Sequence, residues 1–363
     1  MSDRVLVATR KGLFDFRRKG AGAWAIARTS FMGSPVSQML SDPRDGALYA
    51  ALDLGHFGVK LHRSDDDGVT WSEIAAPSYA EVEADAPDKP APSLKLLWSL
   101  ETGGPDEPGV LWAGTVPGGL FRSADRGESW SLVRGLWDQP SRAQWSGAGN
   151  DEPAIHSISV DPRDSRRVAV AISTGGVWET ADGGETWTLG GKGLFAAYMP
   201  PELAEDPVSQ DVHRLVRCAA APDSYWIQHH NGVFRAVDGI GQWTRLHPKQ
   251  SSEFGFAVAV HPRRPDTAWF VPAIKDEFRY PADGRFVVAR TTDGGESFQT
   301  FSEGLPTAAA YDLVFRHGLE VDETGERLAM GSSTGGLWFS ENGGERWTLA
   351  PERLPPIYAV RFA

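Results

Sequence analysis

The chain has 363 residues, of which 41% are hydrophobic and 23% are charged, as in folded globular proteins with a large core. Asp and Glu outnumber Lys and Arg by 48 to 36, and the resulting acidity argues against a nucleic-acid partner. There is no apolar run of the ~18 residues that a membrane helix needs, no basic and apolar leader, and only one cysteine, Cys218. We therefore expect a cytoplasmic protein without membrane segments or internal disulfides.

A short motif recurs along the chain. Three copies have the form S/T-x-D-x-G-x-S/T-W and begin at Ser64, Ser123 and Thr180. A copy at Thr291 ends in Phe, a copy at Ser340 has Asn in place of Asp, and two degenerate copies occupy the remaining intervals. The aromatic residues that end the copies are separated by 47, 59, 57, 56, 55 and 49 residues and are Trp24, Trp71, Trp130, Trp187, Trp243, Phe298 and Trp347. This period is typical of propeller repeats.

Each copy follows a short predicted strand and leads into another, so the motif is expected to be a hairpin turn. Its Asp and hydroxyl side chains can bond to turn amides, its Gly permits positive φ, and its aromatic ring can pack between sheets. An inner strand also recurs and ends at a turn, as at 40–45, 160–164 and 260–264. Each repeat is therefore predicted to be one blade of four antiparallel strands.

The two ends of the chain are predicted to share a blade. The first repeat has no inner strand before Arg4, whereas the last repeat is followed by a spare strand at 357–362. Pairing of that strand within the first blade would remove the open edge of the array. We therefore predict an all-β fold, a seven-bladed β-propeller that forms a single domain over residues 1–363, closed by the C-terminal strand.

At these repeats the chain resembles the Asp-box, or BNR-repeat, propellers, a superfamily that includes sialidases, xyloglucanases and assembly factors. The segments 7–14 and 212–215 resemble bacterial members described as exo-sialidases or glycosyl hydrolases. The resemblance implies that the boxes lie on the face opposite the active site. True sialidase activity is not expected, because Arg4 and Arg10 are not followed by the R-I-P-type motif of the sialidases.

A site is therefore expected where the chain enters each inner strand and where the second and third strands connect. His156 lies six residues before Pro162, and His213 lies six residues before Ala219 in the next repeat. The two histidines are thus predicted to be equivalent and adjacent at the channel mouth. Ser37 and Phe256 hold the same place in other blades.

His230 lies in a predicted loop above His213, beside His229 and Asn231. Neutral imidazoles bind divalent metals, and imidazoles also transfer protons. We therefore consider His156, His213 and His230 as ligands of a divalent metal, with His156 and His213 as catalytic groups. The other interpretation is that these histidines only bond to the backbone or line a wet channel, because their spacing is not a known metal motif.

The longest predicted insertion at this face is the segment 273–284, interpreted as a lid or a subunit contact. Asp276 and Glu277 are candidate acid/base carboxylates, and Arg279 is a candidate for binding an anionic substrate.

Other candidates for substrate binding come from separate repeats. Trp145 can stack on a sugar ring or cap the propeller surface. Arg10, Lys11 and Arg214 would make the mouth positive, although solvated surface charges explain them equally well.

Two functions remain open from the sequence. One is a hydrolase or lyase acting on a polar, glycoside-like small molecule at the channel mouth. The alternative is a non-catalytic binding or assembly propeller. An enzyme is expected to bring buried titratable groups together at the mouth, whereas a scaffold is expected to have a broad exposed patch.

Overall fold

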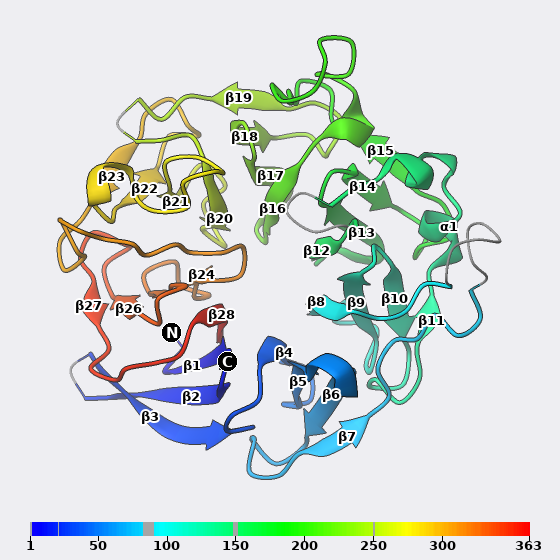
Figure 1. Ribbon diagram of the computed structural model, residues 1–363, viewed down its shortest axis with the longest axis horizontal. Helices are drawn as coiled ribbons and strands as arrows, with labels where there is room; N and C mark the ends of the chain where they lie inside the picture. Colours follow the sequence, from blue (N-terminus) through cyan, green and yellow to red (C-terminus); the bar gives the residue numbers. More distant parts are fainter. Residues whose placement is uncertain (1, 21, 83–90, 148–151, 250) are drawn as a thin grey trace.

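The computed structural model describes residues 2–20, 22–82, 91–147, 152–249 and 251–363. Seven antiparallel sheets of four strands each stand around a central axis, as Figure 1 shows in a view down that axis. The predicted seven-bladed β-propeller is confirmed. In the described part of the chain, no helix is both long and apolar enough to cross a membrane.

Each blade runs from an inner strand at the channel to an outer strand at the rim. Blade one contains, in that order, β28 (Ile357–Phe362), β1 (Arg4–Thr9), β2 (Gly12–Lys19) and β3 (Ala23–Ser30). Blade two contains β4 (Val36–Ser41), β5 (Leu48–Asp53), β6 (Val59–Ser64) and β7 (Ser72–Ile74). Blade three contains β8 (Leu96–Thr102), β9 (Leu111–Val116), β10 (Leu120–Ser123) and β11 (Ser131–Leu132). Blade four contains β12 (Ile155–Asp161), β13 (Asp164–Ile172), β14 (Gly176–Thr180) and β15 (Thr188–Gly190).

The remaining three blades follow the same order. Blade five contains β16 (Val212–Cys218), β17 (Ala221–His229), β18 (Gly232–Ala236) and β19 (Thr244–Leu246). Blade six contains β20 (Gly255–Val260), β21 (Ala268–Pro272), β22 (Val288–Thr291) and β23 (Gln299–Phe301). Blade seven contains β24 (Leu319–Val321), β25 (Leu328–Gly331), β26 (Leu337–Ser340) and β27 (Thr348–Leu349). The short helices are α1 (Arg134–Trp137), η1 (Gly55–Phe57), η2 (Pro140–Gln144), η3 (Pro207–Ser209) and η4 (Ala282–Gly284).

The ring is closed by the C-terminal strand, as predicted. β28 pairs antiparallel with β1, with Val5 opposite Phe362 and Ala8 opposite Ala359. In Figure 1 the red β28 lies beside the blue β1. The first blade is therefore built from both ends of the chain, and this pairing closes the ring of blades.

The recurring motif forms the turn between the third and fourth strands of a blade. In the copy at Thr180, the Thr180 hydroxyl accepts a hydrogen bond from the Gly184 amide at 3.0 Å. Asp182 accepts from both the amide and the hydroxyl of Thr186, at 2.9 and 2.5 Å. These bonds satisfy the turn locally, so its acidic residue has a structural explanation.

The aromatic residue after each turn packs between neighbouring sheets. Trp187 is 8% exposed and donates its indole N–H to the Gly184 carbonyl at 3.0 Å. Its ring belongs to an apolar cluster that joins blades three and four and includes Trp112 and Trp178. The repeat thus supplies both the turn and the contact between blades.

Replacing Trp187 with Ala should lower the free energy of unfolding by about 3–5 kcal/mol, because a large buried ring is lost without a replacement. Chemical denaturation followed by fluorescence measures the change. Val69→Ala is the control, since Val69 lies in an equivalent turn but is 62% exposed. Equal stability losses in the two variants would contradict the packing role of Trp187.

Candidate functional site

A cavity of about 740 Å³ opens at one end of the central channel. It is bounded by the segments that enter the inner strands and by loops between second and third strands, and so lies at the face opposite the motif turns. Residues from all seven blades line it: Ser37, Asp53, Leu96, Trp98, Gln144, Ser146, Thr174, Tyr198, Met199, Ser209, Asp211, His213, His230, Phe256, Asp276, Arg279, Phe315, Arg316, His317 and Tyr358. Its volume is in the range of small-molecule sites.

Several of these side chains occupy one repeated structural position. Six inner strands have a β-bulge or similar irregularity near their first residues, and in five of them a single residue is skipped in the register with the second strand. We call the skipped residues the mouth-bulge residues; they are Ser37, Trp98, His156, His213 and Tyr358. A bulge redirects a side chain out of the regular alternation. Four of the five line the cavity, and His156 does not.

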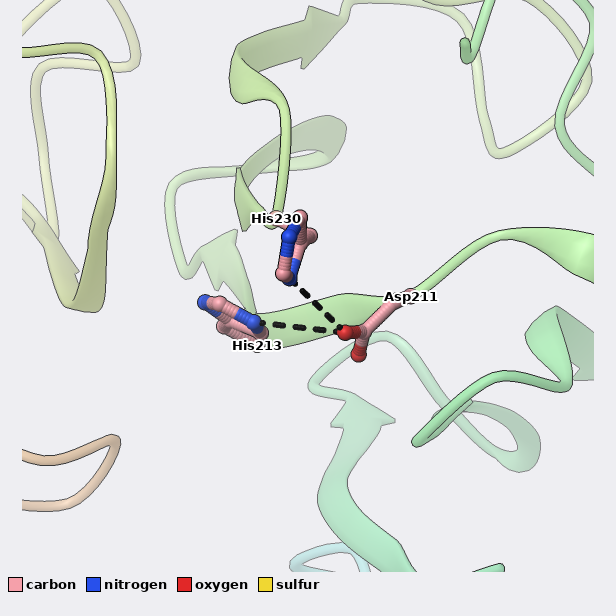
Figure 2. Close-up of side chains that lie close together, drawn as sticks. All are labelled: Asp211, His213 and His230. Carbon is pink, nitrogen blue, oxygen red and sulfur yellow. Dashed lines mark ion pairs between the residues drawn. The ribbon is translucent and has the colours of Figure 1, made fainter. Parts of the chain in front are cut away.

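Asp211, His213 and His230 meet at the cavity wall, as Figure 2 shows. Asp211 precedes β16, His213 is its mouth-bulge residue, and His230 follows β17 in the same blade. Asp211 Oδ2 lies 3.4 Å from His213 Nε2 and 3.2 Å from His230 Nδ1. In the described residues, these three form the group of histidine, cysteine and carboxylate side chains whose ligand atoms could surround a metal ion.

Asp211 and His213 are buried and His230 is partly buried. The neighbouring groups determine which of these side chains carry a proton. His213 is 2% exposed, and its Nδ1 lies 2.6 Å from the Gly255 carbonyl, so that nitrogen donates. Burial lowers the pKa of His213 despite the nearby Asp211. Burial alone would raise the pKa of Asp211, but His213, His230 and Arg316 outweigh it and hold that pKa well below its usual range. The arrangement therefore pairs a carboxylate with a neutral imidazole.

Arg316 brings a positive charge to the same cavity. Its side chain precedes β24, is 6% exposed, and stacks over the rings of Trp98 and Phe256 at 4.7 and 5.4 Å. Burial lowers the pKa of Arg316 to about 10, although Asp211 opposes this effect. Among the described residues it forms no ion pair, and its Nε has no hydrogen-bond partner. The guanidinium is thus a buried charge without a compensating carboxylate in contact.

The 273–284 segment covers part of the cavity with two of its three predicted residues. Asp276 and Arg279 line the cavity and form an ion pair at 2.6 Å. Glu277 does not line it; its side chain is 67% exposed and lies 3.4 Å from Lys275. Whether the segment acts as a lid or as a subunit contact stays a prediction.

Two of the predicted aromatic candidates are enclosed in protein. His156 is fully buried and contacts the edge of Trp98, with ring centroids 5.8 Å apart. Its carbonyl accepts hydrogen bonds from His317 at 2.8 Å and Arg214 at 3.3 Å. Trp145 is 6% exposed and packs against Trp178, while its neighbours Gln144 and Ser146 line the cavity.

The three predicted mouth cations lie outside the cavity. Arg10 and Lys11 are exposed in the β1–β2 turn. Arg214 follows His213 but lines a second cavity of about 440 Å³ toward the other end of the channel. There it accompanies Glu101, Glu320 and Arg361, and Arg361 binds Glu101 at 2.5 Å. The positive charge at the mouth therefore comes from Arg279 and Arg316.

Asp211 and Arg316 were not among the residues singled out from the sequence. Asp211 stands two residues before His213, and the D-x-H spacing was an available signal. Arg316 lies in a segment without regular structure before a three-residue strand, so no periodicity indicated its direction.

No family model matches the chain. The oligoxyloglucan-reducing-end-specific xyloglucanase of Emericella nidulans is 25% identical in an alignment of length 265 that covers 65% of this chain and 30% of that protein. The chain thus spans about a third or less of the curated relative that it matches.

Solved structures share the fold. A GH74 xyloglucanase from Xanthomonas campestris matches with a TM-score of 0.65 and 18% identity, over 96% of this chain and 53% of that one. YCF48 from Cyanidioschyzon merolae matches with a TM-score of 0.56 and 14% identity, over 88% of this chain and 85% of that one. At these identities the matches support the propeller architecture.

Replacing Arg316 with Met should raise the free energy of unfolding by about 1 kcal/mol, because an unpaired buried charge is exchanged for an apolar side chain of similar length. Arg217→Met is the matched control. Arg217 is also buried but is paired with Asp161 at 3.1 Å, so its loss should cost about 3–5 kcal/mol. Urea denaturation measures both values, and a comparable loss in both variants would contradict the assignment of Arg316 as uncompensated.

Glu320 should make stability depend on pH. Enclosure in the channel raises the pKa of Glu320 to about 7, although Arg361 opposes the shift. Between the unfolded value of about 4.3 and 7, the folded state keeps a proton that the unfolded chain releases, so the stabilisation present at low pH is lost as pH rises through 7.

The free energy of unfolding of Glu320→Gln should therefore increase relative to that of the parent protein as pH rises from 5 to 8. We expect on the order of 1–2 kcal/mol, reduced by channel water because the side chain is 31% exposed. Denaturant titrations at several pH values give the difference, with Glu303→Gln, 68% exposed, as control. A difference that stays constant with pH would contradict the raised pKa.

Proposed function

We propose that the protein is a hydrolase or lyase that acts on a polar, carbohydrate-like small molecule bearing an anionic group. The observation that carries this proposal is the convergence of two features on one cavity. The Asp211, His213 and His230 cluster supplies titratable groups, and Arg316 supplies a buried positive charge without a partner. Such convergence is characteristic of active sites.

The unpaired guanidinium supports an anionic substrate. A buried charge is costly unless it is paired, and a carboxylate can accept two parallel hydrogen bonds from arginine. The contacts of Arg316 with the rings of Trp98 and Phe256 hold the guanidinium in place before a ligand binds. Arg279, which lines the cavity and pairs with Asp276, would provide a secondary contact.

The remainder of the cavity suits a sugar-like ring. Its wall combines aromatic side chains, including Tyr198 and Tyr358, with small polar groups such as Ser37 and Ser209. Aromatic faces bind the apolar faces of rings, and the polar groups orient hydroxyls. The similarity to a protein named as a xyloglucanase agrees with a carbohydrate-like ligand.

The cluster is positioned to perform the chemistry. The His213 ring is fixed by the Gly255 carbonyl, which leaves Nε2 oriented toward Asp211. An ionised carboxylate beside a fixed imidazole can take up and return a proton at one site. Arg316 would neutralise the anionic group of the substrate while the bond next to it breaks.

The test is a binding screen by isothermal titration calorimetry with acidic sugars, such as glucuronate, galacturonate and N-acetylneuraminate, against glucose and galactose. The acidic members should bind, and Arg316→Gln should weaken them about 10- to 100-fold, the value of a charged hydrogen-bonded pair. Arg279→Gln is the control, with a smaller effect because Asp276 already pairs Arg279. Equal binding of neutral and acidic sugars, or no effect of Arg316→Gln, would contradict the anionic substrate.

Bond cleavage is tested separately by NMR of bound acidic oligosaccharides. Product formation that disappears in Asp211→Asn supports an enzyme. Binding with no product from any member of the panel would instead establish a non-catalytic binding propeller.

A further inference from the structure

The Asp211, His213 and His230 side chains have the spacing of a first coordination shell. Asp211 Oδ2 is 3.4 Å from His213 Nε2 and 3.2 Å from His230 Nδ1, and the three ligand atoms all lie within 4.8 Å of one another. Ligands about 2.0–2.1 Å from a tetrahedral metal are separated by about 3.3 Å. Two of the three separations therefore already have the value that a bound ion requires.

The hydrogen bond of His213 to the Gly255 carbonyl directs the other ring nitrogen into the cluster. Nδ1 lies 2.6 Å from the Gly255 carbonyl, which only accepts, so Nδ1 donates. Nε2 is then the ring nitrogen left to bind a ligand, and it faces Asp211 Oδ2. A cation held between these two atoms, whether a proton or a metal ion, would make their close approach favourable. Histidine metal ligands ordinarily donate their second nitrogen to a carbonyl in this way.

The carboxylate provides an independent indication. Asp211 is 2% exposed, and its Oδ1 has no hydrogen-bond partner among the described residues. Burial of an unsatisfied carboxylate oxygen is unfavourable, and a cation bound by both carboxylate oxygens would remove the penalty. The side chain lines the cavity, so the cluster can be reached by an ion.

We propose that Asp211, His213 and His230 bind one divalent first-row transition metal, such as Zn²⁺, with an open coordination position toward the cavity. Two imidazoles and one carboxylate favour such ions over Mg²⁺ or Ca²⁺, which prefer oxygen ligands. Three protein ligands with an open fourth position are typical of catalytic rather than structural zinc sites.

The proposed metal site rests on the proposed function only because both use the same cavity. The metal and Arg316 would contact the same anionic group, and the ligand would reduce the repulsion between the two cations. With an ion bound, His213 and Asp211 would hold the metal instead of exchanging a proton, and the ion would polarise the substrate or lower the pKa of a water molecule, which deepens the assignment as a hydrolase or lyase.

The test measures metal content on untagged protein, treated with a chelator and then dialysed against Zn²⁺, Mn²⁺, Fe²⁺, Co²⁺ or Ni²⁺. Mass spectrometry should find about one ion per chain, and the Co²⁺ form should absorb in the visible range. Asp211→Asn, His213→Gln and His230→Gln should each reduce uptake at least tenfold. His247→Gln is the matched control, because His247 is 59% exposed and pairs with Glu253 away from the cavity.

Circular dichroism and thermal melts identify variants that fail to fold, and where a variant fails, the metal content of the parent protein still tests the proposal. Less than a tenth of an ion per chain with every metal offered would overturn it. Uptake that survives all three substitutions would overturn it as well. Acidic-sugar binding without metal would leave the proposed function standing, whereas metal binding without acidic-sugar binding would contradict the proposed substrate instead.

Discussion

Pairing of β28 with β1 is the constraint on which the rest of the structure depends. Each blade buries its faces against its neighbours, so an open ring would expose the faces of two blades to water. Closure also fixes the cavity. Tyr358 belongs to the closing strand, and the segment with Arg316 is held against that strand by a bridge between His317 and Ala359. The geometry of the site therefore depends on a contact between the two ends of the chain.

Polar side chains gather at the mouth of the channel because the inner strands begin there with an irregular backbone. Regular strands alternate their side chains between two blade interfaces, which are filled by apolar residues. The mouth-bulge residues leave this alternation and are free to be polar. Deeper in the channel, His317 and Arg214 both bond to the His156 carbonyl. These bonds tie blades four, five and seven together between the cavity at the mouth and the charged cavity beyond it.

The fold could be predicted from sequence because its signals are local and repeated. The motif at 180–187 specifies its own turn through bonds among Thr180, Asp182 and Thr186, and each copy repeats that information. Even the copy with Asn342 keeps the bond to the amide four residues on, at 3.0 Å. The absent first inner strand and the spare last strand were enough to predict closure.

The site could be predicted only in part. Alignment of the repeats predicts where a residue lies in its blade, but it does not predict which side chains surround that residue. His156 and His213 do occupy equivalent bulges, yet the ring of Trp98 lies against His156 and His213 lines the cavity. Arg214 follows His213 directly and still faces the other cavity, because neighbouring strand residues point in different directions. Asp211 and Arg316 come from segments outside the regular strands, where periodicity says nothing about orientation.

The mouth-bulge position has a consequence for how such a protein can change. Serine, tryptophan, histidine and tyrosine all occupy it on blades of the same architecture. Its side chains also make contacts between blades, as in the bonds of Ser37 to the Leu97 carbonyl and of His213 to the Gly255 carbonyl, yet the blade architecture is the same with each residue. On four blades this side chain lines the cavity, so these residues form part of a ring of replaceable groups around a single ligand. New specificities can arise on this scaffold by point substitution, blade by blade, without insertions or rearrangement of the chain.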